Sequence, residues 1–185
     1  AHALPKVLEA AELLLSREDI AFFFAGSGAE RAKVEQIVQE RNLHNVRLIP
    51  RQPKERMPAL WSACDLSIVP LRDTPVFATV IPSKIFEAMG MGVPILMSLP
   101  EGEATAIVQT TGSGVCVPPE DPEAMAAAIM ALADDPQRLA AYRRTSREAA
   151  PLYSRDKQAA RMVGILEAVA GVVPKGEARE PGVGA

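Results

Sequence analysis

Six apolar residues in a row, Ile20 to Ala25, constrain the fold of this chain more than any other segment. A strand buried on both faces of a sheet has such a continuous run, whereas a strand with one wet face alternates apolar and polar residues. The run stops at Gly26-Ser27-Gly28, and residues 29–41 then have the spacing of a charged amphipathic helix. The segment therefore predicts an inner strand of a parallel sheet, followed by a helix that covers it.

The same alternation continues along the chain. Four more short apolar segments are predicted as strands, at residues 46–49, 66–69, 93–97 and 114–117. Helical patterns are found at residues 5–15, 29–41, 55–63, 83–91, 103–111, 121–133, 137–149 and 155–170. This order predicts an α/β fold, a Rossmann-like parallel sheet of about five strands with helices on both faces. Such a sheet normally opens with a strand but this chain opens with a helix, so we expect a strand to be missing upstream.

Composition argues against several classes of protein. The 185 residues suffice for one domain, expected over residues 1–170, and a flexible tail over residues 171–185. The chain has 20 basic and 23 acidic residues, and this net charge of -3 argues against a nucleic-acid partner. No apolar run reaches the ~18 residues that a membrane span requires, and no secretory signal opens the sequence. We therefore expect a cytoplasmic protein.

Cysteine and histidine are too scarce for most metal sites. The two cysteines, Cys64 and Cys116, and the two histidines, His2 and His44, lie too far apart for a zinc-binding motif. We expect no metal and no cofactor, and we interpret the cysteines as small buried residues in a reducing compartment. The sequence has no GxSxG motif, and only two histidines are available to serve as the base of a Ser-His-Asp triad. No catalytic residue is therefore assigned.

The first candidate ligand site is the turn Gly26-Ser27-Gly28. Ligands of parallel α/β sheets bind at the carboxyl ends of strands, and a glycine turn between strand and helix suits a phosphate or nucleoside. The third glycine of the dinucleotide fingerprint is replaced by Arg31, and no acidic residue ends the next strand. A nicotinamide site is therefore not expected, and two interpretations stay open: a plain tight turn, or a turn that faces another ligand.

The second candidate site is the helix start at Pro82-Ser83-Lys84. A helix N-terminus exposes unpaired N–H groups and partial positive charge, so it attracts a diphosphate, and Lys84 would add to this attraction. Glu87 lies four residues after Ser83 on the same helix face, about 6 Å further along the axis. A carboxylate there could accept hydrogen bonds from both ribose hydroxyls of a nucleotide. The alternative is an ordinary exposed glutamate.

Together with several other segments, this motif resembles the carboxyl-terminal, nucleotide-sugar-binding half of the GT-B glycosyltransferases. The resemblance is strongest to glycosyltransferase family 4, the glycosyl transferases group 1, and extends from about Leu4 to Ala170. It is carried by residues 24–28, 45–50, 57–60, 63–70, 82–94 and 117–124. It implies transfer of a hexosyl group from a UDP- or GDP-type donor, with retention of configuration and without a metal, to a glycan or lipid-linked acceptor. The subgroup it suggests builds cell-surface polysaccharides of the cell envelope.

The resemblance also implies roles for individual positions. Glu87 matches the family glutamate that binds the ribose, whereas the family's other signature glutamate, which contacts the donor sugar, is replaced by Thr79. The glycine turn matches the loop beside the nucleoside, and Arg51 and Gln52 match the turn that reads the base. The implied donor-binding set is Gly26, Ser27, Gly28, Arg51, Gln52, Thr79, Ile81, Pro82, Ser83, Lys84 and Glu87.

Members of this family also contain an amino-terminal acceptor-binding domain, and a strand and glycine-bearing loop before the helix that begins near Leu4. We expect both to be absent here, so that the chain is the donor-binding half of an enzyme and is inactive alone. Two alternatives stay open: a stand-alone module that binds a nucleotide or sugar nucleotide without catalysis, and an α/β domain whose site has lapsed.

Two surfaces carry further partner expectations. Arg143, Arg144 and Arg147 lie on one predicted helix and form either a solvated face or a contact with anionic lipid at the inner face of the membrane. The helix over residues 155–170 has an apolar stripe, at Ala159, Met162, Val163 and Leu166. We expect this stripe to be partly exposed and to promote self-association.

Overall fold

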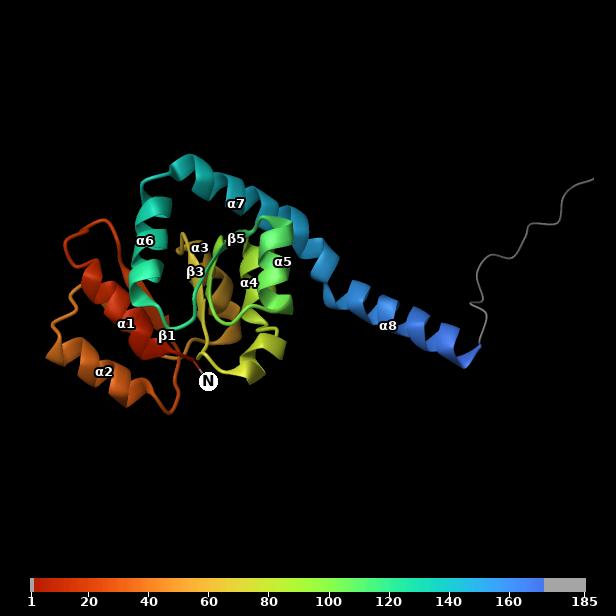
Figure 1. The fold of residues 1–185 in the computed structure, drawn as a ribbon, viewed down its shortest axis with the longest axis horizontal. Coiled ribbons are helices and arrows are strands. Elements are labelled where there is room, and N and C mark those ends of the chain that lie inside the picture. The colour runs from red at the N-terminus through yellow and green to blue at the C-terminus, as the bar shows by residue number, and fades with distance from the viewer. Residues whose placement is uncertain (1, 172–185) are drawn as a thin grey trace, which may run out of the picture. The chain divides into compact units, whose positions relative to one another are not determined.

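The computed structural model describes residues 2–171 (Figure 1). These residues divide into two units, with the boundary between Ala150 and Pro151. Within the described part of the chain, the first unit contains five strands, and the second contains helix α8 (Arg155–Ala170). The predicted domain over residues 1–170 thus spans the first unit and this helix. Apart from Gly171, the predicted tail over residues 171–185 lies outside the described residues.

The elements follow the predicted alternation of helix and strand, which confirms the α/β fold. The strands are β1 (Phe22–Ala25), β2 (Val46–Ile49), β3 (Ser67–Pro70), β4 (Ile95–Ser98) and β5 (Gly114–Val117). The helices of the first unit are α1 (Leu4–Leu13), α2 (Arg31–Glu40), α3 (Met57–Ser62), α4 (Lys84–Met91), α5 (Glu103–Thr111), α6 (Pro122–Ala133) and α7 (Pro136–Ala149). Short 3-10 turns are η1 (Lys54–Arg56), η2 (Pro75–Thr79) and η3 (Ala150–Tyr153).

The strands pair in parallel, but they form two ladders rather than one continuous sheet. Strand β1 pairs with β2, and β3, β4 and β5 pair in that order. A cavity of about 520 Å³ separates the ladders, with β1 on one side and β3 on the other. The expected five strands are present, and their division into two ladders is the feature that the sequence pattern did not predict.

The edges of β1 and β3 that border this cavity have backbone groups without a strand partner. The amide of Phe22 donates to Asn45 O at 2.8 Å and that of Gly26 donates to Ile49 O at 3.1 Å. Because neighbouring residues of a strand direct their N–H and C=O groups to opposite sides, Phe23 and Ala25 direct theirs away from β2. Both residues line the cavity, as do Leu66 and Ile68 on the β3 side.

Helices cover both faces of the strands, as expected. In Figure 1, α1, α2 and α6 gather on one side of the strands, while α4 and α5 lie on the other.

Side-chain oxygens cap the first turns of α6 and α7. Asp121 accepts from the amide of Ala124 at 2.8 Å, and Asp135 accepts from the amide of Arg138 at 2.9 Å. Such caps stabilise a helix by about 1 kcal/mol, so they fix where α6 and α7 begin.

The hydrophobic core lies where α1 and α6 pack on the strands. Leu8 of α1, Leu96 of β4 and Met125 of α6 are fully buried within one cluster of apolar side chains. Gly92 has a left-handed conformation (φ 65°) that ends α4 before β4. The core thereby fixes the strands whose carboxyl ends lead into the candidate site.

We predict that Leu96→Ala lowers the free energy of unfolding by about 2–5 kcal/mol, because it removes fully buried methyl groups and leaves a cavity. Chemical denaturation of the 185-residue chain measures this change. Val76→Ala is the control, since that side chain is 62% exposed and should shift stability by no more than about 0.5 kcal/mol. Equal effects of the two substitutions would contradict this description of the core.

Candidate functional site

The carboxyl ends of β1 and β3 border a second cavity, of about 620 Å³. The glycine turn at residues 26–28 forms one wall, and Val69, Pro70 and Lys84 lie on another. The glycine turn follows β1, and Lys84 begins the helix after the loop that follows β3. Both line this cavity at the carboxyl ends of the strands, where parallel α/β folds bind their ligands. The cavity is therefore the candidate ligand site.

The glycine turn leaves the cavity open beside its backbone. Gly26 has a φ of +138°, in a region that residues with a side chain rarely adopt. A Cβ atom added to Gly26 or Gly28 would meet no atom within 4 Å. The space beside both residues is thus unfilled by protein, as a turn that approaches a ligand requires.

The first turn of α4 presents the other half of the predicted site. Ser83 does not cap the helix; its hydroxyl instead donates to Glu87 Oε1 at 3.2 Å. Both side chains are exposed, as is that of Lys84. The predicted spacing thus does bring Ser83 and Glu87 together. Within the first turn, the amides of Ile85 and Phe86 donate to the carbonyls of Pro82 and Ser83, both at 3.1 Å.

The remaining predicted donor residues do not line this cavity. The Thr79 hydroxyl donates to Val76 O at 2.9 Å within η2, and Gln52 Nε2 donates to Pro50 O at 3.0 Å. Arg51 is exposed, and Ile81 and Pro82 are partly buried in the loop before α4. Of the predicted set, Gly26, Ser27, Gly28 and Lys84 line the cavity, and the donor-binding roles of all eleven residues stay predictions.

Two charged residues of this region were not predicted. The Arg31 side chain donates to Gly26 O at 2.7 Å and to Ile49 O at 3.1 Å. Arg72, in the loop after β3, lies 3.8 Å from Glu30 Oε1 in the loop after β1. The sequence marked Arg31 only as the residue that replaces a fingerprint glycine, and no spacing rule relates Arg72 to Glu30. Their contacts depend on how the loops meet in space.

The described residues contain no group of three or more histidine, cysteine or acidic side chains that could hold a metal ion. Burial, reinforced by the charge of Asp65, raises the pKa of the Cys64 thiol. Burial, together with Glu101, raises the pKa of Cys116 in the same way. Both thiols are therefore protonated near neutral pH, and this makes them weak nucleophiles.

A glycine at the start of α5 positions the loop that contains Thr79. A Cβ atom at Gly102 would lie 2.0 Å from Ala78 O, a contact with backbone that no side-chain movement relieves. η2 thus packs directly on the backbone that precedes α5. The absence of a side chain at Gly102 determines how closely this loop approaches the strands.

The arginines of α7 and the apolar residues of α8 also have observed environments. Arg143 is paired with Asp65, and Arg144 with Glu148. Met162, Val163 and Leu166 of the predicted stripe are all more than half exposed. None of the helices in residues 2–171 has an apolar stretch long enough to cross a bilayer.

Comparison with known proteins identifies the family. Residues 3–149 match the family described as glycosyl transferases group 1. The chain belongs to this family. Its fold is the GT-B fold of these enzymes, which confirms the resemblance inferred from the glycine turn and the Pro82–Pro94 segment.

Individual relatives support this membership. WcaI of Escherichia coli strain K12, named a colanic acid biosynthesis glycosyl transferase, is 32% identical over 130 residues, which are 69% of this chain and 31% of WcaI. A glycosyltransferase structure from Rickettsia africae matches with a TM-score of 0.75 and 15% sequence identity. The match covers 90% of this chain and 44% of the Rickettsia chain. Anabaena HepE, solved in complex with UDP, has a TM-score of 0.69 and 19% identity, with coverages of 92% and 45%. The chain spans about a third of the length of the curated relatives it matches first.

We predict that Gly102→Ala displaces η2 and lowers the free energy of unfolding by about 1–3 kcal/mol, because the new methyl group overlaps Ala78 O. Amide exchange across residues 71–82 should increase, and thermal unfolding should occur at a lower temperature. Gly90→Ala is the matched control: its Cβ would meet nothing within 4 Å, and alanine is favoured in a helix by up to about 1 kcal/mol. A Gly102→Ala protein as stable as Gly90→Ala would refute the contact.

Proposed function

We propose that this chain is the donor-binding part of a hexosyltransferase-type glycosyltransferase. The enzyme would transfer a sugar from a UDP- or GDP-type donor, with retention of configuration and without a metal ion, to a glycan or lipid-linked acceptor. The observation that carries the proposal is the cavity between the glycine turn and Lys84, next to the helix start that presents Ser83 and Glu87. HepE, which shares the fold, has been solved with UDP and with UDP-glucose.

Each part of this site suits one part of a nucleotide sugar. The uncapped first turn of α4 and the Lys84 ammonium favour the two negative charges of a diphosphate. Glu87 has one carboxylate oxygen engaged by Ser83 and a second that is free to accept from a ribose hydroxyl. The glycine turn offers space beside its backbone for the nucleoside. Thr79 would contact the sugar through a neutral hydroxyl, where many relatives use a charged carboxylate.

We further propose that the acceptor-binding domain belongs to the rest of a longer polypeptide, and that the isolated chain is inactive for this reason. The cavity between β1 and β3 supports this proposal, because the strand edges that border it have backbone groups without a strand partner. The ring of His2 lies 3.4 Å from Pro70 O. A strand that runs parallel to β3 and leads directly into α1 would end at this position.

The partner and location proposals follow from the same assignment. We propose that the full-length enzyme works in the cytoplasm, at the inner face of the membrane when its acceptor is lipid-linked. The exposed apolar side chains of α8 are the proposed surface for self-association of the isolated chain. The paired state of Arg143 and Arg144 favours a solvated face of α7 over a lipid contact.

We predict that Glu87→Gln weakens binding of UDP or GDP, whichever the unsubstituted chain prefers, by about 10- to 100-fold. The reason is that hydrogen bonds from the ribose hydroxyls to a charged acceptor are lost. Calorimetry on the 185-residue chain measures this change. The 2′,3′-dideoxy nucleotide sharpens the test: the unsubstituted chain should bind it weakly, and Glu87→Gln should barely distinguish it from the ordinary nucleotide.

Glu40→Gln is the matched control for Glu87→Gln. Glu40 is also an exposed helical glutamate that accepts a hydrogen bond from the side chain four residues before it, Gln36, at 2.7 Å. It ends α2, and α2 runs back from the carboxyl end of β1 to the start of β2, so binding should not change. If both variants bind as tightly as the unsubstituted chain, Glu87 has no role at the ribose. If the unsubstituted chain binds neither nucleotide, the donor-site proposal itself fails.

For the added strand, we predict that the amides of Phe23 and Ala25 exchange at least about tenfold more slowly in the full-length protein than in the 185-residue chain. They would gain hydrogen bonds to a strand between β1 and β3. The amide of Phe22, which already donates to Asn45 O, is the internal reference and should change little. Equal exchange of the Phe23 and Ala25 amides in the two proteins would show that no strand occupies the cavity.

A further inference from the structure

The Arg31 side chain joins the two loops that leave β1 and β2. Its Nη1 atom donates to Gly26 O at 2.7 Å, at the start of the glycine turn. The same nitrogen donates to Ile49 O at 3.1 Å, at the end of β2. Arg31 lies in the first turn of α2 and lines the candidate cavity. A single guanidinium group therefore contacts the backbone at the carboxyl end of each strand of the β1–β2 pair.

Backbone hydrogen bonds complete a closed arrangement around this group. The amide of Arg31 donates to Gly28 O at 3.0 Å, so Arg31 holds the glycine turn at its first residue by the side chain and at its last by the main chain. The amide of Gly26 donates to the same Ile49 carbonyl at 3.1 Å. These bonds connect Gly26, Gly28, Arg31 and Ile49, and they leave Ser27 as the free tip of the turn.

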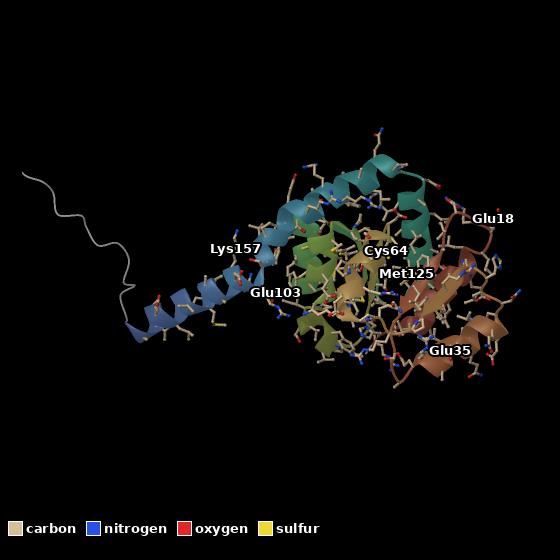
Figure 2. The ribbon with its side chains drawn as sticks, turned by 180° about the vertical axis from the view of Figure 1, so that it is seen from behind. Glu18, Glu35, Cys64, Glu103, Met125 and Lys157 are labelled. Atoms are coloured by element: carbon tan, nitrogen blue, oxygen red, sulfur yellow. The ribbon has the colours of Figure 1, made fainter. Side chains whose placement is uncertain are left out.

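The chemistry of this junction favours an arginine. Its planar fork binds the two carbonyls through Nη1 and Glu35 through Nε in fixed directions, whereas lysine has one ammonium group on a flexible chain. Glu35, four residues later on α2, accepts from Arg31 Nε at 2.8 Å and so fixes the plane of the fork; Figure 2 labels Glu35 on this helix. Without Arg31, the Gly26 carbonyl loses this charge-assisted hydrogen bond.

We infer that Arg31 is a positioning residue of the donor site, an inference that rests on the function proposed above. It holds the glycine turn and the start of the Pro50–Gln52 segment in one fixed arrangement. The turn is then pre-organised before a nucleotide enters, so the ligand does not have to order two loops when it binds. Arg31 Nη1 binds the two carbonyls and Nε binds Glu35, so the positioning role does not require a contact between Arg31 and the nucleotide.

The experiment compares Arg31→Met and Arg31→Lys with the unsubstituted 185-residue chain. In the absence of ligand, Arg31→Met should accelerate amide exchange at Gly26, Ser27 and Gln52 by about tenfold, while the Phe22 amide at the other end of β1 stays unchanged. Arg31→Lys should have an intermediate effect, since a lysine ammonium can donate to the carbonyls but has no second nitrogen, like Arg31 Nε, to hold it to Glu35. Binding of UDP or GDP to Arg31→Met should weaken by about tenfold.

Two further measurements separate positioning from other roles. Arg17→Met removes an arginine that bridges Asp19 and Asp134 near the amino end of β1. This control should lower the unfolding temperature without changing nucleotide affinity. The weakened binding of Arg31→Met should persist at about 0.5 M salt, because exposed charges are screened there and loop order is not.

Each outcome decides the inference. Unchanged exchange at Gly26 and Ser27 in Arg31→Met overturns it whether or not nucleotide binds. A loss of affinity that disappears in salt also overturns it, because Arg31 would then act through charge. If exchange rises as expected but the unsubstituted chain binds neither UDP nor GDP, Arg31 does position the loops and the proposed function is what fails.

Discussion

Parallel pairing of short buried strands is the constraint on which the rest of this structure depends. Because every strand of a ladder runs in the same direction, all their carboxyl ends meet at one edge, and each strand needs a helix to return the chain to the other edge. Pairing of β1 with β2 therefore places the glycine turn beside the segment after β2. The glycine turn also lines one cavity with Lys84, which is 58 positions after Gly26 in the sequence and belongs to the other ladder's side of the fold. The candidate site is a consequence of this topology.

Backbone contacts, more than side-chain pairs, fix the details of the site. Gly26 adopts a φ of +138°, Gly102 lets η2 pack on bare backbone, and the Gly92 conformation ends α4. Each is a position where a side chain would either strain the main chain or collide with it. The charged residues then act on this frame: Arg31 holds two carbonyls, and Ser83 engages Glu87. Because the backbone determines the shape of the site, its side chains do not have to be buried to hold it together.

The sequence was sufficient for those features that local pattern determines. The apolar run at residues 20–25 and the four-residue spacing of Ser83 and Glu87 both depend on the periodicity of a strand or helix. The division into two ladders was not predicted, because hydrophobicity marks a strand but does not say which strand lies beside it. The contacts of Arg31 were also missed. They join Gly26 to Ile49, and only the pairing of β1 with β2 brings those two carbonyls within reach of one side chain.

The two cavities share a wall, and this connects the fold to the proposed function. Leu4, Phe24, Ala25, Ile68 and Pro70 line both of them. A strand placed between β1 and β3 would therefore form the floor of the donor cavity as well as fill the gap between the ladders. It would bury apolar surface of β1 and β3, and this burial stabilises the same strand ends that carry the glycine turn and lead toward α4. Strand completion and donor binding would then favour each other, since each orders backbone that the other needs. Arg31 holds the β1–β2 side of the cavity through its contacts with Gly26 O and Ile49 O, whereas the β1–β3 side would be ordered by the proposed strand.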